Sequence, residues 1–138
     1  MFHVDHFSST ITERGRSKII EDYNHNAKTI EVKEALLILT SVEKQDEPNP
    51  DTVSKKAVDE IAKLANQLKV KIIVLHPFAH LFVELSKPEV ALEVLKKIEI
   101  GLSQCGFKVV RTPFGWFNTI ELKAKGHPLS RVARTIFI

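Results

Sequence analysis

Two short and almost uninterrupted apolar runs constrain the fold of this chain more than any other feature. They cover Ala35–Thr40 and Lys71–Leu75, and each has the length of a strand rather than of a typical helix. Strands without alternating polar residues are typical of the middle of a sheet, where both faces are covered. The sequence therefore predicts two buried central strands.

Two helices are predicted, one before and one after the second apolar run. The first begins at Asn49-Pro50, where asparagine can cap the helix and proline can occupy its first position. Apolar residues then recur at helical spacing as far as Leu68. The second begins at Ser86–Glu89, a capping-box pattern, and its apolar stripe ends before Gly106. Both stripes predict helices that pack on a core rather than bind a cofactor.

Further strands are predicted nearer the two ends of the chain. The segment Glu13–Lys33 is polar and charged and is expected to be a loop or a weakly formed excursion. Strands that alternate with two helices are typical of an α/β or layered α+β fold, and 138 residues suit one domain. We therefore predict a single domain over residues 1–138, with a mixed sheet packed by two main helices. The additional strands are expected at Met1–Thr12, Phe107–Val110, Trp116–Lys123 and Thr135–Ile138.

Composition excludes several classes of protein. No apolar run approaches the roughly 20 residues that span a bilayer, and no signal peptide is expected, since the first residues lack a basic and then apolar layout. The single cysteine, Cys105, cannot form an internal disulfide, which favours a reducing compartment. We therefore expect a cytoplasmic protein without a membrane span. Its strand-like end, Arg134–Ile138, indicates either a boundary with further chain or a terminus docked in the sheet.

No cofactor and no metal are expected. The chain has no glycine-rich phosphate loop, no dinucleotide fingerprint and no Cys/His zinc spacing. His3, His6, His76 and His80 have no carboxylates at a fixed spacing beside them, whereas zinc usually needs three or four convergent ligands.

The charge is unevenly divided along the chain. Residues 1–105 carry 14 Lys/Arg and 16 Asp/Glu, whereas residues 106–138 carry six basic side chains against Glu121 alone. Such a local excess can hold a phosphate backbone. It can equally belong to solvated strand edges, where lysine guards against aggregation.

Two proline-containing segments are candidates for a functional site. His76–His80 directly follows a buried strand, where α/β proteins place ligand sites. Thr112–Asn118 reads as a tight turn that enters a strand, and Gly115 permits a backbone conformation or a close approach closed to other residues. Trp116 and Phe117 can stack on a base or can be core aromatics.

An ordered set of short segments resembles the editing domain of archaeal-type threonyl-tRNA synthetases. The match covers about residues 33–138 well and the first 32 poorly. It comprises Ser41–Lys44, Asn49-Pro50, Val53-Ser54, His76–Leu81, Glu84-Leu85, Lys87-Pro88, Gly101-Leu102, Gly106-Phe107, Pro113–Phe117, Lys125–Leu129 and Arg134–Ile136.

The resemblance implies a fold like that of D-aminoacyl-tRNA deacylases, a homodimer, and hydrolysis of serine wrongly attached to threonine tRNA. The Ser-Gln-Phe-Thr-Leu and Gly-Pro signatures of true D-aminoacyl-tRNA deacylases are absent, which favours the L-serine branch. The implied partners are the 3′ end of tRNA(Thr) and a synthetase catalytic domain, in cis or in trans. The implied catalytic residues are His80 and Asn118. The implied substrate-binding residues are Ser41, Val42, Pro77, Phe78, Ala79, Phe114, Gly115, Trp116, Phe117 and Arg131.

The chain departs from the family pattern at three of these positions. Phe117 and Asn118 stand where a tyrosine and a lysine are often found, and Arg131 stands where a glutamate is often found. Either the domain is weakened or the chemistry does not depend on those side chains. We favour the second reading, because an aminoacyl ester is already activated. Backbone N–H groups around Val42 and Ala79, together with the substrate 2′-hydroxyl, can supply what hydrolysis needs.

Two other classes stay open. One is a catalytically silent tRNA-binding module, suggested by Asn118 and Arg131. The other is a plain dimerisation domain, which would have no affinity for aminoacylated tRNA.

Overall fold

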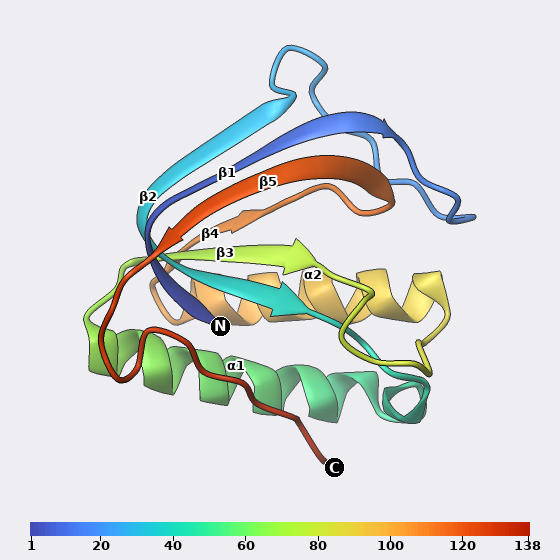
Figure 1. Ribbon diagram of the computed structural model, residues 1–138. Coiled ribbons are helices and arrows are strands. Elements are labelled where there is room, and N and C mark those ends of the chain that lie inside the picture. The colour runs from blue at the N-terminus through green and yellow to red at the C-terminus, as the bar shows by residue number, and fades with distance from the viewer.

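The computed structural model describes all 138 residues and contains five strands and two long helices (Figure 1). A short 3-10 turn at Lys44–Asp46 separates the second strand from the first long helix. The elements in chain order are β1 (Phe2–Arg14), β2 (Thr29–Thr40), α1 (Pro50–Leu68), β3 (Ile72–Pro77), α2 (Pro88–Gln104), β4 (Lys108–Arg111) and β5 (Trp116–Ala124).

The strands form one mixed sheet in the order β4-β3-β2-β1-β5. Strands β2, β3 and β4 run parallel to one another, and β1 runs antiparallel to both β2 and β5. The prediction of an α/β fold with a mixed sheet and two main helices is confirmed.

The sheet bends sharply along β2, so that β1, β5 and the first half of β2 arch over β3 and β4 (Figure 1). Glu34, midway along β2, has a φ of 51°, an uncommon left-handed conformation for a residue with a side chain. Strand β1 has a register shift against β5 at the same level, between Val4 and His6. Such irregularities increase strand bending and twist.

The bent sheet encloses two separate cores. The larger core lies between the sheet and the helices and includes Leu36 and Ile73. The smaller core lies under the arch and includes Leu37, Val74 and Phe7. Consecutive strand residues point to opposite faces, so the continuous apolar run of β2 supplies both cores, as its pattern predicts.

The polar segment before the first apolar run was predicted to be a loop over Glu13–Lys33, and this is wrong at both ends. Strand β1 continues to Arg14 and β2 already begins at Thr29. Ile30 and Val32 pack towards the small core, whereas Glu31 is exposed. A half-buried strand with few apolar residues resembles a loop in sequence.

The predicted strand Thr135–Ile138 is also wrong. This segment has no strand pairing and is held beside α1, where Lys56 Nζ donates to Phe137 O at 2.8 Å and Arg134 lies 3.6 Å from Glu60. Ile136 packs against the larger core. Ile136 is thus half-buried without any strand pairing, and Phe137 and Ile138 stay exposed.

The predicted helix limits hold better than the predicted caps. Proline occupies the start of both helices, and Gly106 follows the end of α2 with a φ of 93°. Asn49 is the N-cap residue of α1, but its side chain makes no capping bond. The capping box at Ser86 is wrong, because Lys87 is the N-cap residue and Ser86 Oγ donates to Lys87 O instead. No helix is both long and apolar enough to cross a membrane.

Candidate functional site

The adjacent carboxyl ends of β2 and β3 form the centre of the candidate site. Thr40 lies opposite Pro77 in the parallel register, and Phe78 N donates to Thr40 O at 2.8 Å. The two following loops then meet, because Ser86 N donates to Val42 O and Lys44 N donates to Glu84 O, each at 3.0 Å. Segments 41–44 and 77–86 are thereby fixed as one rim of the sheet.

Several backbone N–H groups of this rim have no acceptor within the protein. Among them are those of Val42 and Ala79, each two residues beyond the paired positions Thr40 and Pro77. Unpaired backbone donors are uncommon in buried surroundings, and Val42 is buried. The register places Val42 and the exposed Ala79 at the same edge of the sheet, on the two loops that follow Thr40 and Pro77.

A cavity of about 580 Å³ opens beside this rim, between the end of β2, the helices and the C-terminal segment. This size is within the usual range for a small-molecule site. Ser41, Val42 and Arg131 line it, whereas His80 and Phe114–Asn118 do not. The remaining lining is mostly apolar, and its charged side chains are Glu43, Asp46, Glu60 and Arg134.

The polar groups of the cavity are not all satisfied by the protein. Ser41 Oγ is buried and has no hydrogen-bond partner. Asp46 Oδ2 accepts the N–H of Glu43 at 2.9 Å, and burial raises the pKa of Asp46 against the opposing effect of this bond. A buried polar group without a partner is unfavourable, so a ligand that bonds Ser41 Oγ is favoured.

His80 lies on the loop beyond β3 and is exposed. Its ring packs edge-on against Phe78, with centroids 5.3 Å apart, and Phe78 is half-buried. This contact orients the His80 ring, whose nitrogens form no hydrogen bond within the protein. Pro77, Phe78 and Ala79 thus belong to the rim but do not line the cavity.

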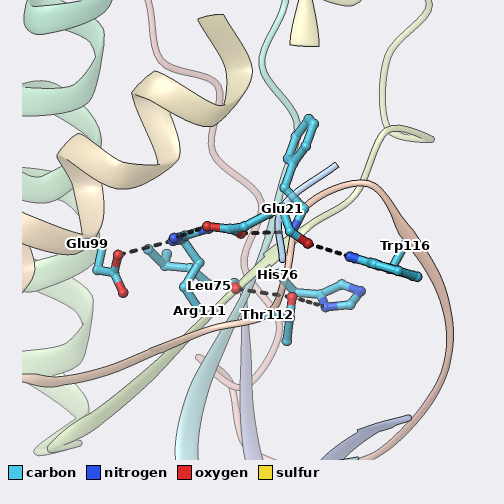
Figure 2. Close-up of polar contacts among 8 residues, drawn as sticks. Glu21, Leu75, His76, Glu99, Arg111, Thr112 and Trp116 are labelled. Carbon is cyan, nitrogen blue, oxygen red and sulfur yellow. Dashed lines mark hydrogen bonds and ion pairs between the residues drawn. The ribbon is translucent and has the colours of Figure 1, made fainter. Parts of the chain in front are cut away.

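The other histidine of this segment, His76, is buried and belongs to the scaffold. Its Nδ1 lies 2.8 Å from Thr112 Oγ1, and Thr112 Oγ1 also donates to Leu75 O at 3.5 Å (Figure 2). This arrangement fits a neutral imidazole, and desolvation lowers the pKa of His76 from 6.5 to about 4.

The buried His76 predicts a loss of stability in mild acid. Below pH 6.5 the unfolded chain takes up a proton at His76 that the folded chain excludes until about pH 4. The free energy of unfolding should therefore fall by about 2 kcal/mol between pH 7 and pH 5 from this residue alone. Urea unfolding across this range measures it. His76→Asn should flatten the pH dependence, whereas the exposed control His25→Asn should keep it; an equally steep profile in His76→Asn contradicts the assignment.

The turn before β5 is fixed by a residue that sequence reasoning missed, Glu21. Its side chain forms a two-pronged ion pair with Arg111, at 2.6 and 2.7 Å, and accepts the N–H of Phe114 at 3.0 Å (Figure 2). Its carbonyl accepts the indole N–H of Trp116 at 2.6 Å. Burial acts to raise the pKa of Glu21, but the hydrogen bonds from Arg111 and Phe114 prevail and lower it.

Gly115 explains why this turn packs so closely on the loop 15–28. Its φ is 91°, and a Cβ atom there would lie 2.7 Å from Ile19 O. Gly15 N also donates to Gly115 O at 2.9 Å. Both reasons that the sequence suggested for a glycine at this position, a special conformation and a close approach, therefore apply.

The aromatic and polar residues at the start of β5 do not share one surface. Trp116 is held by Glu21 and packs edge-on against Tyr23, with centroids 4.8 Å apart. Phe117 is about half exposed, and Asn118 is less exposed. Because side chains alternate along a strand, Phe117 and Asn118 project from opposite faces of β5. They can contact one ligand only if it wraps around the strand.

No group of three or more His, Cys, Asp or Glu side chains has a metal-binding arrangement. What the site offers is a rim of unpaired backbone donors, an accessible histidine and a largely apolar cavity with a few polar groups. In structural class this is a small α/β domain with a candidate ligand site at the carboxyl ends of its parallel strands.

Comparison with known proteins defines the family. Residues 1–136 match the family described as the archaea-specific editing domain of threonyl-tRNA synthetase, and the chain belongs to this family. It is 45% identical over 136 residues to a threonine–tRNA ligase of Thermococcus kodakarensis, a match that covers 99% of this chain and 22% of the relative. The corresponding ligases of Methanopyrus kandleri and Methanocaldococcus jannaschii are 42% and 43% identical over 97% and 99% of the chain, and 21% of each relative. The chain thus spans about a fifth of the length of these relatives.

Proposed function

We propose that this domain hydrolyses the ester of seryl-tRNA(Thr) and so removes serine wrongly attached to threonine tRNA. Membership of the editing-domain family supports the class of reaction. The structural observation that carries the proposal is the pair of unpaired N–H groups, on Val42 and Ala79, at the rim of the sheet. The proposed partners are the 3′ end of tRNA(Thr), a second copy of the domain and a synthetase catalytic domain, in the cytoplasm.

The chemistry needs little from side chains. Water attacks the carbonyl carbon of the ester, and negative charge develops on the carbonyl oxygen as the tetrahedral intermediate forms. Two positioned N–H groups stabilise such an oxyanion, and this is often the largest catalytic effect. The bond to the 3′-oxygen then breaks, and that oxygen takes a proton as it leaves. In our proposal the 2′-hydroxyl of the terminal adenosine orients the water, and His80, which is exposed and next to Ala79, can assist.

The site also suits the charge of an aminoacyl ester. The amino group of such an ester is cationic at neutral pH, and the carboxylates Glu43 and Asp46 line the cavity next to Val42. Ser41 Oγ, which has no partner in the protein, can accept or donate a further hydrogen bond. These groups can hold the substrate amine and hydroxyl beside the backbone donors.

Selectivity is expected to come from exclusion. Threonine exceeds serine by one methyl group, and a pocket that favours the larger side chain gains only about 1–3 kcal/mol from it. A synthetase site built for threonine therefore admits some serine. A second site, whose walls include the backbone around Val42, Pro77 and Ala79, can instead exclude the methyl group by a clash.

Hydrolysis of two matched substrates tests this proposal. This fragment alone should cleave seryl-tRNA(Thr) and largely spare threonyl-tRNA(Thr), because only the threonine methyl clashes with the backbone walls. Release of labelled amino acid measures both rates. Equal rates would contradict the steric explanation. Binding of both substrates without cleavage would indicate a silent tRNA-binding module, and absence of binding would indicate a dimerisation domain.

A further inference from the structure

The cavity beside the rim has two arginines on its C-terminal wall, and only one of them is paired. Arg134 lies 3.6 Å from Glu60 and also donates to Ala133 O at 2.8 Å. Arg131 is exposed, and its guanidinium has no hydrogen bond or ion pair with any other residue. The cavity therefore has one free guanidinium on its lining.

The backbone on both sides of Arg131 is firmly held. His3 N donates to Ser130 O, and Val132 N donates to Met1 O, each at 2.9 Å. Arg131 itself forms a β-bridge with Phe2. The free guanidinium is thus presented from a fixed backbone position, which lowers the entropy lost when it binds a ligand.

The chemistry of a guanidinium limits what it can take. Its planar fork of donors matches a phosphate or a carboxylate, and an aminoacyl ester contains no carboxylate. The carboxylates Glu43, Asp46 and Glu60 also line the cavity and disfavour an anion beside them. A phosphate is therefore favoured at Arg131 and disfavoured next to these carboxylates.

We infer that Arg131 binds the phosphate on the 5′ side of the terminal nucleoside whose aminoacyl ester enters the site. This inference rests on the proposed function and specifies how the RNA strand leaves the cavity. It assigns Arg131 to RNA binding and not to the hydrolysis step. It also gives a direct role to one of the basic side chains that accumulate after residue 105.

Two small substrates that differ only in this phosphate test the inference. One is adenosine with serine esterified to its 3′-oxygen, and the other is the same compound with a 5′-phosphate. For the unaltered domain, kcat/KM should be roughly fivefold to tenfold higher with the phosphate, as expected for a partly exposed charged contact. In Arg131→Gln this ratio should fall to near one, and Arg131→Lys should retain part of it.

The controls separate this contact from general charge and from failure of the proposed function. Lys108→Gln removes an exposed cation at the start of β4 and should keep the full ratio. Added salt should lower the ratio in the unaltered domain, because it weakens phosphate contacts. A ratio that persists in Arg131→Gln, or its absence in the unaltered domain, overturns the inference alone. Failure to hydrolyse these compounds and seryl-tRNA(Thr) alike overturns the proposed function.

Discussion

A seryl-tRNA(Thr) that lacks the 2′-hydroxyl of its terminal adenosine should bind this domain almost normally and be hydrolysed roughly 100- to 1000-fold more slowly. The 2′-hydroxyl is adjacent to the ester and, in our proposal, orients the attacking water. The loss of one well-placed hydrogen bond in the transition state accounts for a reduction of this size. Single-turnover hydrolysis of the 2′-deoxy and normal substrates, with serine on the 3′-oxygen of both, measures the effect.

Two variants assess the side chains that remain. Asn118→Ala should have little effect, because Asn118 already replaces a charged residue of the family pattern. His80→Ala should have a larger effect if the accessible ring contacts the ribose or the water. If the 2′-deoxy substrate is cleaved at the normal rate, a side chain must orient the water instead, and His80 is the first candidate. Complete loss of activity in a folded Asn118→Ala variant would show that Asn118, and not His80, is the important side chain.

Arg111→Met should lower the free energy of unfolding by about 3–5 kcal/mol, the usual effect of removing one partner from a buried ion pair. The Arg111 side chain is 11% exposed and bonds both Glu21 and Glu99, at 2.6 and 3.1 Å. Its removal leaves two carboxylates unpaired between the loop 15–28 and α2. Urea unfolding followed by the fluorescence of Trp116, the only tryptophan, measures the change.

An exposed ion pair provides the matched control. Lys97 pairs with Asp51 at 2.7 Å, but the two side chains are 37% and 84% exposed. Lys97→Met should therefore lower the free energy of unfolding far less than Arg111→Met. Similar losses in Arg111→Met and Lys97→Met would show that the Glu21–Arg111 pair is not important for stability.

The sequence identifies the strands that carry the candidate site but not how they pair. The runs that end at Thr40 and Leu75 are recognisable as buried strands, whereas the contact between the loops that follow them appears only in the parallel register of β2 and β3. The bonds of Glu21 were not predictable, since Glu21 and Arg111 are 90 residues apart and nothing local marks either as a partner. The opposite directions of Phe117 and Asn118 follow from strand periodicity once β5 is located.

The sequence by itself determined the elements whose causes are local. Continuous apolar runs produced strands with two buried faces, and prolines at the first turn and a glycine after the last turn set the limits of the helices. The tertiary structure alone decided where β2 begins, why the last residues lie along α1, and which charges pair across the arch. In each of these cases a weak local preference was overcome by burial or by an ion pair between distant segments. Such contacts exist only after the sheet has bent, and no pattern of neighbouring residues specifies them.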